Sequence, residues 1–436
     1  MKKTRILAVL ALVAALAPAT WAEGQKEEAL SNEEVTLKLS VFQGANGKEF
    51  WEVLGERFTE RYPNVKVEVK AHPQIGEVVR TDFLSGNVAD FIYMSISDPV
   101  TASIVMDKEV ADITEEMKSI EDKFLPGFLD TPSMSPYGDG KIYLAPHIVA
   151  TTGLWYNKTL FEKEGLALPK DWNEVFSLAN TIQDRELFVY QGIYPGYLQC
   201  FVYSMFASAP NGYETMKRIM NYDSSALDDP GFRQGLEILA QMKDNDALMK
   251  EVAGLDHTTS QSMFLRGDAT FIPCGTWIVN EMKDAPKEEG FVYGMMASPS
   301  IVPGAEQWVS SKTEEVWIPK SAPNMEWAKK FLLFLYEDQN IELQAEMTAS
   351  IPPVKGLIET LTPYADPAVV SSLESLQDPN VKGFSLTFAP VAGLETPPDL
   401  FFLEQIGGVM NQIITVDEFI ETVKPVLDEA KAVLNN

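Results

Sequence analysis

The sequence predicts an α/β fold in which helices cover both faces of a mostly parallel sheet, arranged as two lobes. The first observation is the element order near the start, because strand-like and helix-like segments alternate from residue 35 to residue 94. The second is length, since about 410 residues follow the leader and a single hydrophobic core seldom supports so many. The third is that no repeat or low-complexity linker divides the chain. We therefore expect the chain to cross between its lobes more than once.

The first alternating region runs strand, helix, strand, helix, strand. Its segments are a strand at 35–42, a helix at 48–62, a strand at 65–69, a helix from 75 to about 86 and a strand at 89–94. The first helix carries large apolar side chains at every fourth position from Phe50 to Tyr62 and stops before Pro63, as a core-facing helix does. Ligands of such sheets sit beyond the carboxyl ends of the strands, so a site is expected at loops 43–47 and 95–98.

A second alternating region begins after the segment DGKIYLAP at 139–146. Asp171 is placed to cap a helix, and Glu174 can reach back in a capping box. A last helix is expected to start near Thr415 and to kink at Pro425.

The leader has the form of an export signal. MKKTRILAVLALVAALAPATWA places Lys2, Lys3 and Arg5 ahead of an apolar run that ends in small residues, with cleavage expected after Ala22. The run is too short for a permanent anchor, and no cysteine near the cleavage point predicts a lipid anchor. We expect residues 1–22 to be a cleavable signal peptide, with the mature protein in the periplasm or another extracytoplasmic space.

The overall charge excludes some partners. The formal net charge is −28, and such a surface repels phosphate backbones and anionic lipid, so nucleic-acid and membrane-surface roles are not expected. Two cysteines are present, Cys200 and Cys274. They could form a disulfide in an oxidising compartment or stay as two buried thiols, and their spacing does not choose between these states.

The tripeptide Arg266-Gly267-Asp268 is one that some adhesion receptors recognise. It falls where a helix should end, because Gly267 suits the left-handed position after a helix and residues 269–272 should resume as a strand. We interpret it as a turn, and a purely adhesive function is kept only as an alternative.

Six segments resemble, in order, the extracellular solute-binding proteins of sugar-type ABC importers, the maltose- and multi-sugar-binding family. The segments are FTERYPNVKVEV (58–69), SGNVADFIYMS (85–95), DGKIYLAP (139–146), LWYNKTLFEKEGLALPKDWNEV (154–175), MFLRGDATFIPCGTW (263–277) and ASIPPVK (349–355). Together they span most of the chain after the leader, and their order is more specific than any one of them.

The resemblance implies a two-lobe periplasmic-binding-protein (venus-flytrap) fold with hinge crossovers near 147–150, 294–298 and 316–320. Lobe I would hold residues 35–147 and 298–317, and lobe II residues 148–297 and 318–436. The function implied is capture of a sugar or oligosaccharide in the interlobe cleft and delivery to the transmembrane permease of an ABC importer, by a monomer that is not an enzyme.

A neutral sugar offers C–H-rich faces and a rim of hydroxyls, so its site needs flat aromatic side chains and a few aligned polar groups. The resemblance nominates Trp277 as a stacking platform, because the family carries a Trp after the same Gly-x pair. Gln43 and Asn46 follow the first strand, and Ser95 and Ser97 follow the third. Turn chemistry at Asn46 and capping by the serines are the structural alternatives.

The resemblance also nominates Tyr197 and Gln199 in lobe II, and Phe402 near a second stacking aromatic of the family. For Phe402 a place in the core is the main alternative. The sequence departs here from the maltodextrin-binding members, which have tryptophan-bearing stretches and acidic contacts at several of these positions. The resemblance therefore implies the sugar class without implying maltose.

Two other classes of function stay open from the sequence alone. A secreted carbohydrate-active enzyme needs two carboxylates roughly 5 to 10 Å apart, and no local motif nominates such a pair. No zinc motif is present, because His72, His147 and His257 lie far apart, and we expect neither metal nor cofactor. A binding protein for a non-sugar solute such as a polyamine would suit the acidic surface.

Overall fold

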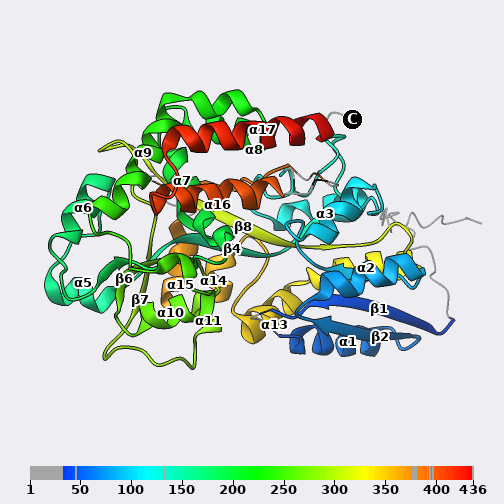
Figure 1. Ribbon diagram of the computed structural model, residues 1–436. Coiled ribbons are helices and arrows are strands. Elements are labelled where there is room, and N and C mark those ends of the chain that lie inside the picture. The colour runs from blue at the N-terminus through cyan, green and yellow to red at the C-terminus, as the bar shows by residue number, and fades with distance from the viewer. Residues whose placement is uncertain are drawn as a thin grey trace, which may run out of the picture. The chain divides into compact units, whose positions relative to one another are not determined.

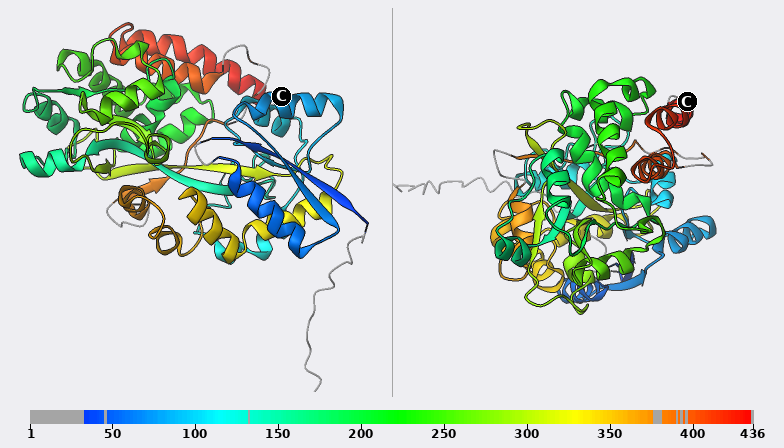
Figure 2. Two further views of the ribbon diagram at one scale, coloured as in Figure 1. Left: turned by 90° about the horizontal axis from the view of Figure 1, so that it is seen from below. Right: turned by 60° about the vertical axis from the view of Figure 1, so that its left-hand side comes forward.

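The structure is a computed structural model, shown as a ribbon in Figures 1 and 2. It describes residues 33–44, 47–131, 133–375, 381–389, 391, 394 and 397–434. The expected signal peptide lies outside the described residues, as does Asn46. The described residues from Glu34 onward form one compact unit. No helix among them is both long enough and apolar enough to cross a membrane.

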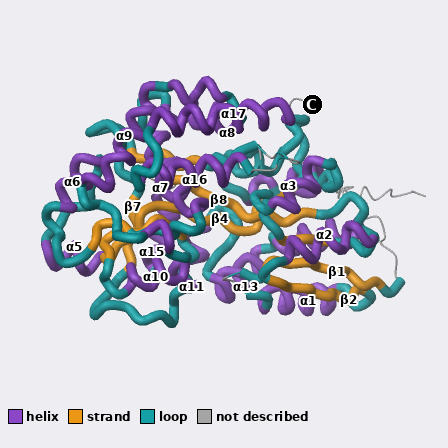
Figure 3. The backbone as a smooth tube through the Cα atoms, viewed as in Figure 1, coloured by secondary structure: helices purple, strands orange, loops and turns teal. Residues whose placement is uncertain are grey.

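Nine strands form one mixed sheet within the described residues. They are β1 (Val35–Phe42), β2 (Val65–His72), β3 (Phe91–Tyr93), β4 (Leu144–Asn157), β5 (Glu186–Phe188), β6 (Ala269–Gly275), β7 (Tyr293–Met296), β8 (Gln307–Trp317) and β9 (Val381–Phe384). Their order is β2-β1-β3-β8-β4-β6-β5, with β7 paired to β4 and β9 to β8. Figure 3 shows the strands running through the interior with helices outside them.

The sheet is parallel where the sequence predicts parallel strands. β1 pairs in parallel with both β2 and β3, which confirms the first alternating region. β8 pairs antiparallel with β3 and β4, and β4 pairs antiparallel with β6 and β7. The expectation of a mostly parallel sheet is therefore wrong around the two long strands, because β4 runs against all three of its neighbours and β8 runs against β3 and β4, with only β9 parallel to β8.

Helices cover both faces of this sheet, and Figure 1 shows α1 and α2 on opposite sides of β1 and β2. The helices are α1 (Glu49–Arg61), α2 (Ile75–Ser85), α3 (Pro99–Met106), α4 (Thr114–Ser119), α5 (Lys158–Glu164), α6 (Trp172–Ala179), α7 (Gln199–Ala207), α8 (Gly212–Met220), α9 (Pro230–Asp244), α10 (His257–Leu265), α11 (Ile278–Glu281), α12 (Met325–Leu335), α13 (Asp338–Thr348), α14 (Leu357–Leu361), α15 (Pro367–Glu374), α16 (Pro398–Met410) and α17 (Val416–Leu434).

Local sequence explains where several helices begin and end. The Asp171 carboxylate accepts hydrogen bonds from the first backbone N–H groups of α6, and Glu174 accepts one from the Lys170 N–H. The expected helix start at Thr415 is confirmed, because its N–H donates to the Glu418 carboxylate. Pro425 lies inside α17, as predicted.

The Arg266-Gly267-Asp268 segment is the turn that the sequence predicts. α10 ends at Leu265, Gly267 has φ +83°, and β6 begins at Ala269. The Arg266 guanidinium pairs with the Asp268 carboxylate at 2.8 Å, so the two charged groups of the tripeptide bind each other.

The strands β4 and β8 connect the two ends of the sheet. The first part of β4, from Leu144 to Thr152, pairs with β8, and its last part, from Thr152 to Asn157, pairs with β6 and β7. The register between β4 and β8 is interrupted once, between Pro146 and Ile148, which makes His147 the extra residue of a bulge. The crossover expected at 147–150 lies within β4.

The helices α12 and α13 differ from the expected division of the lobes. The guanidinium of Arg57 in α1 donates to the Asn340 side chain at 3.3 Å, and Phe58 packs edge-to-face on Phe331 and Phe334. The buried Asp90 accepts hydrogen bonds from both the backbone and the side chain of Asn324. These contacts join residues 324–340 to α1 and to Asp90, which the resemblance assigns to lobe I, although it assigns residues 318–436 to lobe II.

Candidate functional site

The loop after β3 is held by the strand β8. The Ser95 hydroxyl donates to Oε2 of Glu315 at 3.0 Å, and the Ile96 N–H donates to the same oxygen at 2.9 Å. Oε1 of Glu315 accepts from the Thr313 hydroxyl at 2.7 Å. Glu315 is 1 % exposed, and its burial raises the pKa of the carboxyl to about 7. The Ser95 hydroxyl is therefore held in place by its hydrogen bond to the buried carboxyl group of Glu315.

The other residues predicted on these two loops are partly accessible. Ser97 is exposed and its hydroxyl donates to the Ser95 hydroxyl at 3.0 Å. Neither serine caps α3, because the Asp98 carboxylate does so by accepting from the Val100 N–H. Gln43 is half-buried, and its side chain bonds no other described residue. Gln43, Ser95 and Ser97 thus keep groups that a solute could reach.

The structure brings Trp277 and Tyr197 together from distant segments. Trp277 follows β6 and is half-buried, and its ring lies over Gly275 so closely that a Cβ there would collide with it. Tyr197 lies in a short 3₁₀ helix (Pro195–Leu198), and its ring meets Trp277 edge-to-face with centroids 6.3 Å apart. The Tyr197 ring also stacks with the His257 ring, with centroids 6.4 Å apart and an angle of 7° between the planes. Burial raises the pKa of the Tyr197 hydroxyl far above its usual value.

Two predicted residues of lobe II have different outcomes. Gln199 is the first residue of α7 and is half-buried, next to the aromatic pair in the chain. Phe402 has 0 % exposure and packs against Phe232, Phe388 and Phe419 at 5.6 to 6.1 Å. This burial contradicts a stacking role for Phe402, because neither face of its ring is free for a ligand.

The two cysteines are buried free thiols, which decides the alternative that the sequence left open. The Gln261 amide contacts the Cys274 sulfur at 3.7 Å. Burial raises the pKa of the Cys200 thiol to about 11, so it stays protonated near neutral pH.

Sequence reasoning missed two charged residues on β8, Lys312 and Glu314. Both are half-buried, and alternation along a strand places them on one face. The Tyr93 hydroxyl from β3 donates to Oε2 of Glu314, while the Lys312 ammonium has no hydrogen bond or ion pair to any described residue. Burial lowers the pKa of Lys312 and raises that of Glu314. The sequence signal that could have pointed to them is the run Lys312-Thr-Glu-Glu315, because consecutive polar residues are unusual inside a strand of a buried sheet.

Two of these segments meet at α7, because α7 follows the 3₁₀ helix of Tyr197 directly and packs on β8, where the Ser310 N–H donates to the Ser204 hydroxyl at 3.1 Å. The Cys200 thiol, in the first turn of α7, is close enough for its charge state to affect both Lys312 and Cys274. Cys274 in turn influences Tyr197. We call this set the hinge site; its members are Gln43, Tyr93, Ser95, Tyr197, Gln199, Trp277, Lys312 and Glu314. It combines aromatic faces, hydrogen-bond donors and carboxylate acceptors, which is what a polyhydroxylated solute requires.

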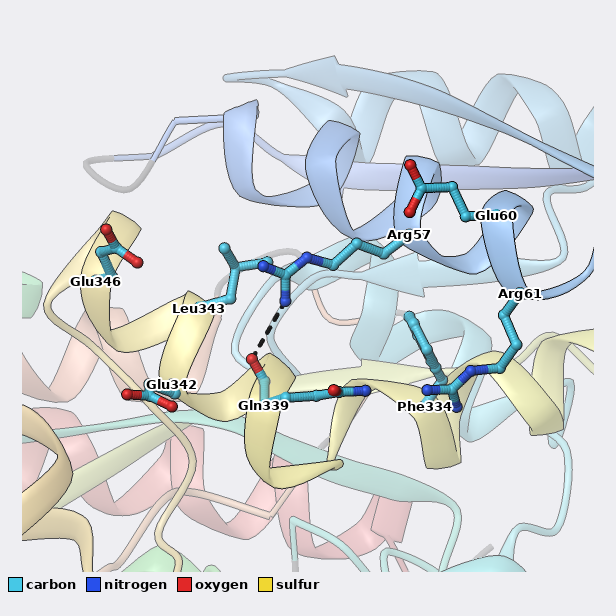
Figure 4. Close-up of a pocket in the computed structure, with 8 residues that line it drawn as sticks. All are labelled: Arg57, Glu60, Arg61, Phe334, Gln339, Glu342, Leu343 and Glu346. Carbon is cyan, nitrogen blue, oxygen red and sulfur yellow. Dashed lines mark hydrogen bonds between the residues drawn. The ribbon is translucent and has the colours of Figure 1, made fainter.

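A separate pocket of about 650 Å³ lies between α1 and α13 and shares no residue with the hinge site. Figure 4 shows Arg57 reaching from α1 toward the Gln339 carbonyl, to which it donates at 3.3 Å. The Arg61 guanidinium pairs with Glu337 and lies 4.6 Å from the centre of the Phe334 ring. The arginines of this pocket are thus already used to hold α13 on α1.

Comparison with known proteins decides the family. The profile described as bacterial extracellular solute-binding protein matches residues 43–342, which is more than half of the chain. The chain belongs to this family of solute-binding proteins. Proteins of this family bind solutes and are not enzymes, so the carbohydrate-active enzyme is set aside.

Two relatives of this solute-binding protein are named for the sugars they bind. A diacetylchitobiose binding protein of Streptomyces coelicolor is 24 % identical over 83 % of this chain and 78 % of its own length. A galactooligosaccharide-binding protein of Bacillus subtilis is 24 % identical over 72 % of this chain and 70 % of its own.

Solved structures confirm the fold of the solute-binding protein. A chitin oligosaccharide binding protein superposes with a TM-score of 0.72, at 18 % identity over 92 % of this chain and 99 % of that chain. A solute-binding protein in complex with raffinose gives a TM-score of 0.69, at 17 % identity over 91 % of this chain and 100 % of that chain. The two-lobe α/β fold predicted from the sequence is thereby confirmed.

Proposed function

We propose that this solute-binding protein captures a sugar or oligosaccharide at the hinge site and delivers it to the permease of an ABC importer. The observation that carries the proposal is the edge-to-face pair of Trp277 and Tyr197, next in the chain to α7, which packs on the strand β8 that carries Lys312 and Glu314. An aromatic face covers the C–H side of a sugar ring, and the polar groups satisfy its hydroxyls. The names of the relatives, which include binders of diacetylchitobiose and galactooligosaccharides, support the same class of solute.

The proposed site draws on both lobes. Gln43, Tyr93 and Ser95 come from lobe I, and Tyr197 and Trp277 come from lobe II. Lys312 and Glu314 lie on β8, which pairs both with β3 of lobe I and with the part of β4 that continues into lobe II. A solute that contacts both lobes would favour a closed form over an open one, because only the closed form makes both sets of contacts. We place α12 and α13 in lobe I in this scheme and keep the remaining boundaries as the resemblance implies.

A polyamine is the rival solute, since the net charge of −28 attracts cations. The position of Lys312 argues against it, because a cationic solute would meet an ammonium that no anion neutralises by direct pairing.

A thermal-shift panel tests the proposed function. Purified protein without its leader would be melted alone and with raffinose, maltose, diacetylchitobiose, galactooligosaccharides and spermidine. A solute at 100 times its dissociation constant stabilises by about 2.7 kcal/mol, which moves the melting temperature by a readily measured amount. We expect at least one sugar to raise the melting temperature; a shift with spermidine and with no sugar would replace the sugar by a polyamine.

A further inference from the structure

The strand β8 carries a charged pair for which neither the fold nor the protein core provides a use. Lys312 and Glu314 lie two residues apart and on one face, in a stretch whose pairing with Ala150 and Ile148 of β4 is regular. Both are half-buried, whereas Val316 and Trp317 beyond them are fully buried. A charged group removed from water needs a partner, and its burial is costly without one.

The two side chains are satisfied to different degrees. Oε2 of Glu314 accepts from the Tyr93 hydroxyl, and Oε1 accepts from no described residue. The Lys312 ammonium is a donor of up to three hydrogen bonds, and none of them is made within the described residues. The acidic groups that act on Lys312 are Glu314 and Glu315 on its own strand and Asp399 in α16, and none of them forms an ion pair with it. One free donor and one free acceptor therefore lie side by side.

This arrangement matches a pair of neighbouring hydroxyls. Each hydroxyl can accept one hydrogen bond and donate another, so one hydroxyl can accept from Lys312 while its neighbour donates to Glu314. Alternate residues of a strand are roughly 6 to 7 Å apart along the chain, a spacing that flexible Lys and Glu side chains can shorten to reach adjacent hydroxyls of one sugar ring.

Resting on the proposed function, we infer that Lys312 and Glu314 form the polar floor of the solute site and recognise two neighbouring hydroxyls of a neutral sugar ring. Because both residues belong to the strand shared by the two lobes, they would hold one edge of the ring at the hinge while Trp277 and Tyr197 cover its face. Solutes that lack a free pair of neighbouring hydroxyls on the bound ring would bind poorly.

Calorimetric titration of three variants with the sugar chosen by the thermal-shift panel tests this inference. Lys312→Met keeps the length and the apolar stem and removes the charge, and Glu314→Gln keeps the shape and removes the anionic acceptor. We expect each to weaken binding at least about 10-fold, since a hydrogen bond to a charged group is lost in each case. Lys382→Met is the matched control, because Lys382 lies on the adjacent strand β9, is half exposed and pairs with Glu306. We expect the Lys382→Met variant to bind the sugar with the same affinity as the unmodified protein.

Lysine labelling of the unmodified protein supplies a measurement that needs no variant to fold. The lysine amines of the protein would be methylated with formaldehyde and borohydride, once with the sugar and once without it. The extent of methylation at each lysine would be measured by peptide mass spectrometry. We expect the sugar to protect Lys312 and to leave Lys382 unchanged.

The outcomes separate the two proposals. Protection of Lys312, together with weaker binding by folded Lys312→Met, supports the inference. Equal labelling of Lys312 with and without a bound sugar overturns it, whether or not the variants fold, while the proposed function stands. If no sugar binds the unmodified protein at all, the proposed function fails, and the inference fails with it.

Discussion

Trp277 is the residue on which the proposed site depends most. It lies half-buried beside Tyr197, with Gly275 leaving room for its ring. We predict that Trp277→Ala weakens sugar binding about 10-fold or more, because lost stacking and burial are worth about 1 to 3 kcal/mol. Calorimetric titration would measure the change. Tyr364→Ala is the control, since Tyr364 is 39 % exposed and is no part of the hinge site. Unchanged affinity in folded Trp277→Ala would remove this residue from the site.

His147 gives a prediction about acid stability. It is 3 % exposed at the bulge of β4, packed on Trp51 and Tyr93, with Nδ1 unbonded, and burial lowers its pKa from 6.5 to about 3. Between pH 6.5 and about pH 3, His147 is therefore protonated in the unfolded chain and neutral in the folded protein. Stability should fall as pH drops from 6.5 toward 3, by up to about 1.4 kcal/mol per pH unit.

Urea unfolding of His147→Gln measures this contribution of His147. The stability of the unmodified protein relative to the variant should decline between pH 6.5 and pH 4. A difference that stays constant over this range would show that His147 is protonated equally in both states.

At the scale of single elements, Glu315 joins the loop after β3 to β8. Its raised pKa of about 7, against 4.5 in the unfolded chain, has the opposite sign to that of His147. The protonated carboxyl is favoured in the fold, so its contribution is present below about pH 4.5 and is lost as pH rises through about 7. We predict that Glu315→Gln gains stability relative to the unmodified protein over this rise, as measured by urea unfolding.

The same variant tests whether Glu315 positions Ser95. Glutamine keeps one acceptor oxygen for Ser95, Ile96 and Thr313, whereas Glu315→Ala keeps none. Sugar affinity should fall in Glu315→Ala and recover in part in Glu315→Gln. Equal affinities in the two variants, both folded, would leave Glu315 with no role in placing the loop.

Asp90 carries a second prediction at this scale. Its carboxylate accepts from the Lys38 N–H at 2.8 Å and from the Asn324 N–H at 2.7 Å, which ties β1 to the segment before α12. Asp90→Ala should lower the free energy of unfolding by about 3 kcal/mol, because the Lys38 N–H and both the N–H and the side-chain amide of Asn324 lose a charged, buried acceptor. Sugar affinity should stay within about twofold, since Asp90 is a structural residue.

Sequence patterns predicted the single helices, caps and turns better than they predicted which elements pack against one another. The four-residue spacing in α1, the cap at Asp171 and the turn at Gly267 depend on residues within a few positions, and all three are confirmed. The contacts of α12 and α13 with α1 could not be predicted from local patterns, because they join residues about 280 positions apart. For the same reason the polar run at 312–315 gave no hint that Lys312 would lie near α7 and Glu314 near Tyr93.

At the scale of the whole molecule, the proposed function requires closure around the solute. Contacts from both lobes favour the closed form, so adding the bound sugar should reduce the radius of gyration measured by small-angle scattering. Buffer without sugar and a non-binding sugar from the thermal-shift panel serve as controls. An unchanged scattering curve at saturating sugar would show that binding needs no lobe movement.

The pairing of β4 and β8 also determines whether either lobe can fold as a separate fragment. Each contributes backbone hydrogen bonds to strands of both lobes, so no cut in the chain frees one lobe without severing a ladder that the other needs. A fragment limited to either lobe would expose an unpaired strand edge and should aggregate when expressed alone. For the intact protein, one shared ladder means that calorimetry should record a single cooperative melting peak and not two independent ones.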